Sequence, residues 1–383
     1  MGGNACAFDV IVLGGGPAGC VTAMLLARRG FAVAVVDRPA SRPFAIGETL
    51  PPQASRLLAE LDLTDRFRLL GSLPSSGIIS VWGNDTPEVN DFIFSVQGNG
   101  WHIDRSAFNR MLAETANDAG ATFFHNARIS ACKDNESGWC TAISTSEGLH
   151  TLQCRFVVDA RGRGARGYFG FPGRIVFDSL IAVAGLAPPR RFAVPSDFTL
   201  IEAVDQGWFY SVFLPCGQYM MAFMTDTDLY ASGRARSKDF VTMQLANAPR
   251  TLERIEGAPE SVAVFSAVTS IRETATRPNW LAVGDAAVSH DPLSGQGLLG
   301  AMKMARRAVS PIAIALGGRD VSGAYENDNR NAFAHYLHAY KTYYGSERRW
   351  PESPFWRRRA VAEDHHPWYK PTAHDPSSTE SAD

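Results

Sequence analysis

The sequence predicts an α/β protein, α+β overall, in which a nucleotide-binding sheet is joined to a second mixed β-sheet and a helical C-terminal segment. An apolar, β-branched run, Phe8–Leu13, precedes a glycine-rich stretch and then Pro17–Arg29, whose apolar positions recur at helical spacing. A second apolar run, Phe31–Asp37, completes a strand–helix–strand unit. Residues 161–224 alternate apolar and polar, which is typical of strands, and aromatic side chains recur at helical spacing over 325–344.

The glycine-rich stretch has the spacing G-x-G-x-x-G at Gly14, Gly16 and Gly19. Between a strand and a helix, the first glycine permits a tight turn and the second lets a pyrophosphate approach the backbone. The third lets helix and strand pack closely, and the helix N-terminus faces the phosphates. Asp37 ends the second strand, where a carboxylate accepts hydrogen bonds from a ribose. The unit therefore predicts a Rossmann-like dinucleotide site.

Two other stretches match the same glycine spacing. Gly162–Gly167 follows a strand, Phe156–Asp159, but no second strand–helix–strand unit with a terminal acid comes after it. Gly295–Gly300 follows a loop. Because the spacing has this meaning only between a strand and a helix, we expect one dinucleotide, bound at the N-terminus.

The composition excludes several classes of function. The chain has 383 residues and a formal net charge of −2, which gives no electrostatic case for nucleic acid or an anionic membrane. Its six cysteines contain no C-x-x-C pair, so neither a zinc site nor a secreted disulfide framework is expected. No apolar run is long enough to span a bilayer, and the N-terminus lacks the pattern of a signal peptide. We expect a cytoplasmic protein without a metal.

Four later segments identify the dinucleotide by family resemblance. Residues 154–162 (CRFVVDARG), 279–285 (NWLAVGD), 291–297 (DPLSGQG) and 101–108 (WHIDRSAF) together resemble the FAD-dependent aromatic hydroxylase superfamily. The resemblance implies an FAD-binding domain of that type and FAD as the cofactor. With the glycine turn, it implies these FAD-binding residues: Gly14, Gly16, Pro17, Ala18, Gly19, Asp37, Arg38, Gly47, Arg105, Ile129, Asp159, Gly162, Gly284, Asp285, Pro292, Gly295, Gln296, Gly297 and Leu298.

The resemblance is closest to the halogenase-like branch of these flavoproteins. Gly47–Pro51 (GETLP) and Gly207–Pro215 (GWFYSVFLP) resemble two of its segments. Three departures argue against halogenation: the second tryptophan of the halogenase W-x-W motif is missing, residues 69–82 contain no lysine, and Ser294 stands where halogenases have an acid. We expect the chain not to be a halogenase.

The C-terminal part resembles flavoproteins that mature quinoprotein amine and amino-acid oxidases. The resemblance rests on residues 343–359 (YYGSERRWPESPFWRRR) and on Ser76–Gly83. It implies an FAD monooxygenase that hydroxylates a tryptophan side chain in a precursor polypeptide during cysteine tryptophylquinone biogenesis. Such an enzyme needs molecular oxygen and electrons from NAD(P)H or a flavin reductase. Two alternatives stay open: a flavin reductase or dehydrogenase of the prenyl-reductase type, and a flavin-binding maturation chaperone.

Two residues are candidates for proton transfer. Glu48 lies in an apolar turn near the expected flavin, where desolvation raises the pKa of a carboxyl group and suits it to acid–base work. The alternative is a structural carboxylate that caps nearby amides. His290, in the flavin loop, could donate to a peroxide or hydroxyl, although a lone histidine is more often a structural donor. For Arg105 the alternative to cofactor contact is a surface arginine at a helix start that Asp104 caps.

Other aromatic and basic residues are candidates for contact with the substrate or a partner. Trp82, Trp208 and Tyr210 are expected beside an aromatic substrate, with core packing as the alternative. Phe355 and Trp356, beside Arg357–Arg359, are expected to anchor the precursor polypeptide, with packing on the domain as the alternative for Trp356. The arginines at 348, 349 and 357–359 are expected to form a solvated basic face, with a dock for an acidic partner as the alternative.

The predicted organisation has four parts. Three runs, Ala121–Ala131, Gly138–Thr145 and Leu152–Asp159, predict a small meander inserted in the nucleotide-binding sheet. A hairpin, Trp208–Leu214 to Tyr219–Thr225, is expected to form a second sheet with Ile78–Trp82 and Phe92–Trp101, and 325–344 to pack on the main domain. The expected parts are an FAD-binding domain (1–75, 102–165 and 275–318), a substrate domain (76–101 and 166–274), a C-terminal helical segment (319–359) and a disordered tail (360–383).

Overall fold

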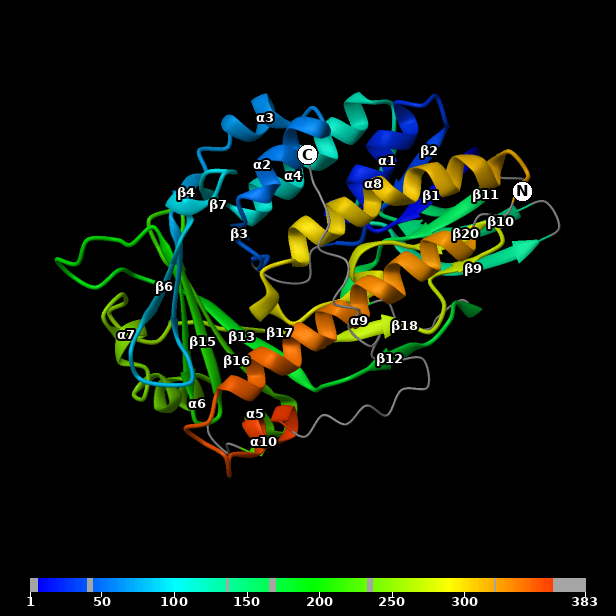
Figure 1. Cartoon of the computed structure of the whole chain (residues 1–383). Helices are drawn as coiled ribbons and strands as arrows, with labels where there is room; N and C mark the ends of the chain where they lie inside the picture. Colours follow the sequence, from blue (N-terminus) through cyan, green and yellow to red (C-terminus); the bar gives the residue numbers. More distant parts are fainter. Residues whose placement is uncertain are drawn as a thin grey trace, which may run out of the picture.

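The structure is a computed structural model that describes residues 6–39, 44–135, 138–164, 170–232, 237–319 and 322–360. In these residues the strands form an eight-stranded sheet, a seven-stranded sheet and two small three-stranded sheets. Helices pack around the eight-stranded sheet, and the seven-stranded sheet lies beside it (Figure 1). The α/β fold predicted from the sequence is confirmed.

The eight-stranded sheet carries the predicted nucleotide-binding unit. Its path runs β19-β20-β11-β1-β2-β8, and β10 and β9 extend from β11. The strands are β1 (Cys6–Leu13), β2 (Val33–Val36), β8 (Thr122–Phe124), β9 (Arg128–Asn135), β10 (Gly138–Thr145), β11 (Gly148–Asp159), β19 (Thr276–Arg277) and β20 (Trp280–Ala282). β1 is parallel to β2 and to β11, as a strand–helix–strand unit requires. All four residues of β2 are buried, which explains the unbroken apolar run in the sequence.

One helix, α1 (Pro17–Ala27), packs against two others, α4 (Arg105–Asp118) and α8 (Gly297–Leu316). Together with the sheet they form the largest apolar core of the described residues. Asp104 caps α4, since its carboxylate accepts hydrogen bonds from the backbone N–H groups of Ser106 and Ala107. The expected cap at Asp104 is confirmed.

The seven-stranded sheet has the order β17-β13-β16-β15-β14-β5-β6. Its strands are β5 (Gly77–Val81), β6 (Glu88–Asp91), β13 (Leu180–Ala187), β14 (Phe198–Val204), β15 (Gly207–Phe213), β16 (Tyr219–Asp226) and β17 (Ala263–Ser266). The predicted hairpin is confirmed, because β15 and β16 are antiparallel with Trp208 opposite Met224. One face of the sheet contributes to a second core that contains Trp208, and the other contributes to a third core that contains Phe209.

The remaining elements connect or cover these sheets. One small sheet contains β3 (Thr49–Leu50), β7 (Gly100–His102) and β4 (Leu73–Ser75), and the other contains β12 (Arg174–Val176), β18 (Ser270–Arg272) and β21 (Val288–Ser289). The other helices are α2 (Gln53–Glu60), α3 (Thr64–Arg68), α5 (Thr227–Ser232), α6 (Ser237–Leu245), α7 (Pro249–Leu252), α9 (Ser322–Ser346) and α10 (Pro354–Ala360).

The long helix α9 crosses from the eight-stranded sheet toward the seven-stranded one (Figure 1). Its buried aromatic residues belong to both regions, since Phe333 lies in the first core and Tyr344 in the second. The prediction that the aromatic stripe packs on the protein is therefore confirmed. The predicted tail falls on residues 361–383, outside the described residues.

Two predictions about strands were wrong. The run Ala121–Ala131 is not one strand, because Asn126 adopts a positive φ of 54° and separates β8, which pairs with β2, from β9 in the meander. The run Phe92–Trp101 does not join the second sheet. Asp91 caps a 3₁₀ turn at Phe92–Phe94, and the chain then enters β7 in a small sheet. A local side-chain cap thus overrides the apolar character of this segment.

Candidate flavin site

The glycine turn between β1 and α1 has the geometry that a pyrophosphate needs. Gly14 has a φ of 111°, and a Cβ there would lie 2.5 Å from the carbonyl oxygen of Ala160. At Gly19 a Cβ would lie 1.9 Å from the Gly14 carbonyl oxygen, so helix and turn approach too closely for any side chain. At Gly16 a Cβ would meet nothing within 4 Å, so the surface there is open beside the N-terminus of α1.

The acid at the end of β2 holds this turn. The Asp37 carboxylate accepts a hydrogen bond from the backbone N–H of Gly15 at 3.0 Å. Asp37 is half-buried, and its neighbour Arg38 is exposed with its guanidinium 3.8 Å from the position of a Cβ on Gly164. The turn after β11 therefore lies next to the residues expected to hold the adenosine end of a dinucleotide.

Asp159 does not face a cofactor, which corrects the prediction that it contacts FAD directly. Its side chain has no exposed surface, and both carboxylate oxygens accept hydrogen bonds from arginines. Arg161 donates at 2.9 Å, and the fully buried Arg272 donates at 3.0 Å. The acid at the end of β11 is thus part of an internal ion-pair network. Arg161 is two residues away in the sequence, whereas Arg272 is 113 residues away, so no local spacing predicts the second pairing.

Gly284 and Asp285 lie in a 3₁₀ turn that follows β20 and touches α1. A Cβ on Gly284 would lie 2.7 Å from the Cβ of Ala18, so this turn packs directly on the helix that starts at the glycine motif. The Asp285 carboxylate is partly exposed and accepts a hydrogen bond from Nε of Arg163 at 3.0 Å. Gly162 opens the turn that carries Arg163 and has a φ of 69°. Arg163 is a residue of this site that sequence reasoning missed.

Arg105 connects two acids that are distant in sequence. Its guanidinium donates to the carbonyl oxygen of Gly47 at 3.3 Å and to Asn109 at 3.0 Å. Burial lowers the pKa of Arg105, while the carboxylates of Glu48 and Asp285 raise it. Arg105 is the first residue of α4, which Asp104 caps, and its side chain also bonds to the turn that carries Glu48; its contact with the cofactor stays a prediction.

Glu48 is the most distinctive acid of the site. It is buried, and its Oε1 has no hydrogen-bond partner in the residues that the structure describes. Burial raises its pKa to about 7, although two backbone hydrogen bonds and the charge of Arg105 act in the opposite direction. A carboxyl group with this pKa exchanges protons readily near neutral pH.

Two hydroxyl groups lie close to Glu48. The Tyr210 hydroxyl and the Thr49 hydroxyl are 2.7 Å apart, although they are far apart in the sequence. Burial raises the pKa of Tyr210 well above its usual value, and the Glu48 carboxylate raises it further. Tyr210 is half-buried and packs against the second core together with Leu293 of the loop before α8. The predicted placement of Tyr210 beside the site is consistent with this geometry.

The loop before α8 forms the other wall. Asp291 caps the 3₁₀ turn Pro292–Ser294 by accepting a hydrogen bond from the Leu293 N–H at 2.8 Å, and Gly295 follows with a φ of 60°. Gly295 and Gln296 are exposed, and α8 starts at Gly297.

The side chains of Leu298 and Ile129 pack toward the first core: Leu298 is buried in it, and Ile129 is half-buried against it. A contact of Leu298 with a cofactor would therefore come from its backbone.

His290 lies among aromatic rings. Its ring is 4.4 Å from that of Tyr336 and 6.3 Å from that of Phe333. Burial lowers the pKa of His290 to about 4, so the imidazole is neutral near neutral pH and keeps one N–H. Because this N–H can still donate a hydrogen bond, the role of His290 stays a prediction.

Two expected substrate contacts are core residues. Trp208 is 1% exposed, and its indole N–H donates to the Tyr344 hydroxyl at 2.9 Å. Trp82 is half-buried and donates to the Tyr343 carbonyl oxygen at 2.9 Å. The ring of Trp82 meets Trp208, Tyr344 and Trp356 edge-on, so core packing describes both tryptophans.

The expected docking segment is also built into the protein. Phe355 and Trp356 are buried, and the Trp356 indole donates to the Val204 carbonyl oxygen at 3.0 Å. Arg359 is buried and pairs with Asp226 at 2.7 Å, which corrects the solvated basic face at that position. Trp356 and Arg359 therefore bond to β14 and β16, whereas Arg348 and Arg357 are exposed.

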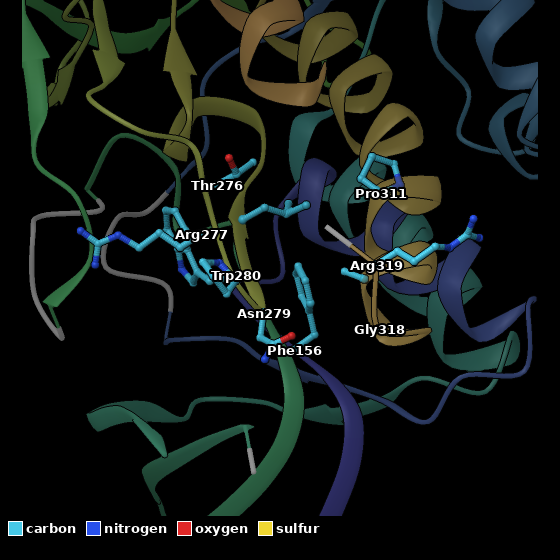
Figure 2. A pocket seen from close by; sticks show the side chains of 11 residues that line it. Phe156, Thr276, Arg277, Asn279, Trp280, Pro311, Gly318 and Arg319 are labelled. Carbon is cyan, nitrogen blue, oxygen red and sulfur yellow. The ribbon is translucent and has the colours of Figure 1, made fainter. Parts of the chain in front are cut away.

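A cleft of about 250 Å³ lies elsewhere, at the β19–β20 hairpin and the C-terminal end of α8 (Figure 2). Its lining includes Phe156, Trp280 and Pro311, and none of the expected FAD-binding or catalytic residues. Phe156 lies three residues before Asp159, the last residue of β11. The cleft nevertheless shares no lining residue with the expected flavin site.

No group of three or more metal-ligating side chains occurs in the described ranges. No helix of the described chain is both long and apolar enough to cross a membrane.

Comparison with known proteins identifies the family. A model of the FAD binding domain family, FAD_binding_3, matches residues 7–336. The chain belongs to this FAD-binding family. It is an FAD-dependent oxidoreductase, and the open surface at Gly16 with the closed packing at Gly14 and Gly19 fits the pyrophosphate of FAD.

Three known proteins are similar to this chain in sequence or in fold. The putative FAD-dependent oxidoreductase LodB of Marinomonas mediterranea is 28% identical over 92% of this chain and 96% of its own. The halogenase CndH, a myxobacterial protein, has a TM-score of 0.83 at 21% identity, covering 94% of this chain and 87% of its own. The peptidyl tryptophan dihydroxylase QhpG has a TM-score of 0.73 at 23% identity, covering 92% and 79%.

Proposed function

We propose that this flavoprotein is a monooxygenase that hydroxylates a tryptophan side chain in a precursor polypeptide during cysteine tryptophylquinone biogenesis. The observation that carries the proposal is a buried, partly unsatisfied carboxyl group, Glu48, beside the Tyr210–Thr49 pair, in a chain whose first lysine is Lys133. The segments where halogenases have their lysine precede that position, and Ser294 replaces their acid. The chain thus has a candidate proton-transfer group and lacks both the lysine and the acid expected for halide chemistry.

The substrate class is supported by the resemblance of residues 343–359 to maturation flavoproteins and by the name of QhpG, a peptidyl tryptophan dihydroxylase. The seven-stranded sheet with its helices would serve as the substrate domain, and the eight-stranded sheet as the FAD-binding domain. The partners would be the precursor polypeptide, molecular oxygen, and NAD(P)H or a flavin reductase.

Bound FAD, once reduced, activates oxygen for transfer to an aromatic ring. The protein's own contribution would be to orient the indole and to move protons. Oε1 of Glu48 would take the proton that leaves the hydroxylated ring carbon, because its pKa of about 7 balances acceptance and release. Arg105 would hold this turn through its bond to the Gly47 carbonyl oxygen, and the Tyr210 hydroxyl would border the indole.

The test is a mass measurement on a polypeptide substrate. FAD-loaded protein, NADH, a flavin reductase and isotopically labelled oxygen are mixed with an unmodified quinoprotein subunit that carries the cysteine and tryptophan of this cofactor. We expect labelled oxygen on the tryptophan, and its loss with Glu48→Gln while FAD remains bound.

Chloride or bromide in the same mixture should yield no halogenated tryptophan. Halogenation, equal hydroxylation of free tryptophan, or full activity of Glu48→Gln would each contradict the proposal. Reduction of a prenyl chain without oxygen uptake would instead support the reductase alternative.

A further inference from the structure

We propose that a chain of aromatic rings along α9 carries one-electron oxidation away from the flavin site to the molecular surface, and so protects the site from misdirected oxidants. The chain consists of Tyr336, Tyr340, Tyr344, Trp82, Trp356 and Trp350, and we call it the aromatic chain. It is independent of the substrate proposed above, because any flavoprotein that activates oxygen can form such oxidants without a substrate.

The first half of the aromatic chain follows one face of α9. Tyr336, Tyr340 and Tyr344 are four residues apart, which stacks them on the same side of the helix. Their ring centroids are 6.0 Å and 4.6 Å apart. The chain starts at the flavin loop, since the ring of Tyr336 is 4.4 Å from that of His290 and its hydroxyl accepts a hydrogen bond from the Asp291 N–H.

The second half leads outward through three tryptophans. The Tyr344 ring is 5.6 Å from that of Trp82, which is 5.1 Å from Trp356. Trp356 stacks on Trp350 at 6.1 Å, and Trp350 is only half-buried. Since electron tunnelling falls off exponentially with distance, several short steps between oxidisable rings are much faster than one long step across the same protein.

Packing alone does not require this choice of residues. Phe333, on the same helix, is fully buried and fills its place without a hydroxyl group. The tyrosines instead bring phenol groups into the interior, where desolvation raises the pKa values of Tyr336 and Tyr344. Tyrosine and tryptophan are also among the side chains that lose one electron most easily.

Oxidation of a phenol needs a proton acceptor, and the structure supplies one. The Tyr344 hydroxyl donates to Oδ2 of Asp291 at 2.8 Å. Asp291 is 1% exposed, and its burial together with the nearby charge of Asp178 raises its pKa to about 6, which makes the carboxylate a better base than usual. The Trp208 indole donates to the same hydroxyl and holds its orientation.

The proposed steps balance as follows. Superoxide, formed when reduced flavin passes one electron to oxygen without substrate, gains one electron and two solvent protons and becomes hydrogen peroxide. Tyr336 loses that electron. Tyr344 replaces it by electron transfer through Tyr340 and passes its own proton to Asp291. Trp82 then gives an electron to Tyr344, the proton returns from Asp291, and the radical cation passes through Trp356 to Trp350. A soluble thiol or ascorbate supplies the last electron.

The test maps oxidative damage during turnover without substrate. FAD-loaded protein is reduced and exposed to oxygen with catalase present, and oxidised tyrosine and tryptophan are located by peptide mass spectrometry. Freeze-quenched samples are examined for protein radicals by electron paramagnetic resonance. We expect oxidation at Trp350 and a tyrosyl or tryptophanyl radical. In the double variant Tyr340→Phe, Tyr344→Phe both should be lost, and damage should move to Tyr336 and His290.

The matched control is Tyr325→Phe. Tyr325 is a buried tyrosine of α9 whose hydroxyl donates to the Ala282 carbonyl oxygen, and it lies off the aromatic chain. It should leave Trp350 oxidation unchanged, and Tyr340→Phe alone repeats the test if the double variant is unstable. Undiminished Trp350 oxidation in the Tyr340 and Tyr344 variants, or an equal loss in the control, would overturn the proposal.

Discussion

Replacing Trp356 by alanine tests whether this residue packs in the core or docks a partner. Trp356 is 2% exposed, packs against Trp82, Tyr344 and Phe355, and donates to the Val204 carbonyl oxygen. Trp356→Ala removes a buried indole and its hydrogen bond, and removals of this kind cost about 3–5 kcal/mol. At about 2 °C per kcal/mol for a chain of this size, the midpoint of thermal unfolding should fall by about 6–10 °C.

The assay pairs thermal unfolding with partner binding. Unfolding is followed by circular dichroism, and the affinity for the precursor polypeptide is measured well below the unfolding midpoint of the variant. We expect a lower midpoint, an unchanged affinity and an unchanged flavin spectrum. Tyr343→Ala, which removes a 63% exposed aromatic on neighbouring α9, is the control for loss of surface area. An unchanged midpoint with weaker binding would refute the assignment of Trp356 to the core.

Three further predictions test the flavin site and the ion pairs. Gly16→Val would place a side chain in the open space beside α1, and the purified protein should be colourless; retention of FAD in equal proportion would contradict the assignment. Arg272→Met leaves the buried carboxylate of Asp159 with only Arg161, and urea denaturation should show a loss of about 3–5 kcal/mol. Glu48 favours folding when it is protonated. Its contribution to the free energy of unfolding is therefore complete below pH about 4.5 and is lost as pH rises through about 7. The difference in thermal-unfolding midpoint between wild type and Glu48→Gln should therefore change over that pH range. A difference that stays constant with pH would count against the raised pKa.

The glycine turn and its acid were determined by the sequence alone. Gly14, Gly16 and Gly19 are required by close approaches within a single strand–turn–helix unit, so their spacing is readable without any distant partner. The same holds for the Asp104 cap, which bonds to amides two and three residues away. The glycine turn and the Asp104 cap both depend on contacts between residues close in the sequence, so residue spacing is enough to predict them.

Tertiary structure alone decided which acids and aromatics face the site. Thr49, in the small sheet with β3, and Tyr210, in the seven-stranded sheet, form one hydroxyl pair, and Arg272 pairs with the buried Asp159. Trp356 has the composition of a docking residue, yet it is buried because Val204 lies opposite it in the folded chain. A side chain's exposure depends on residues more than a hundred positions away, and no local spacing records them. Neighbouring residues thus determined the glycine turn, and distant contacts determined the burial and the partners of the side chains around it.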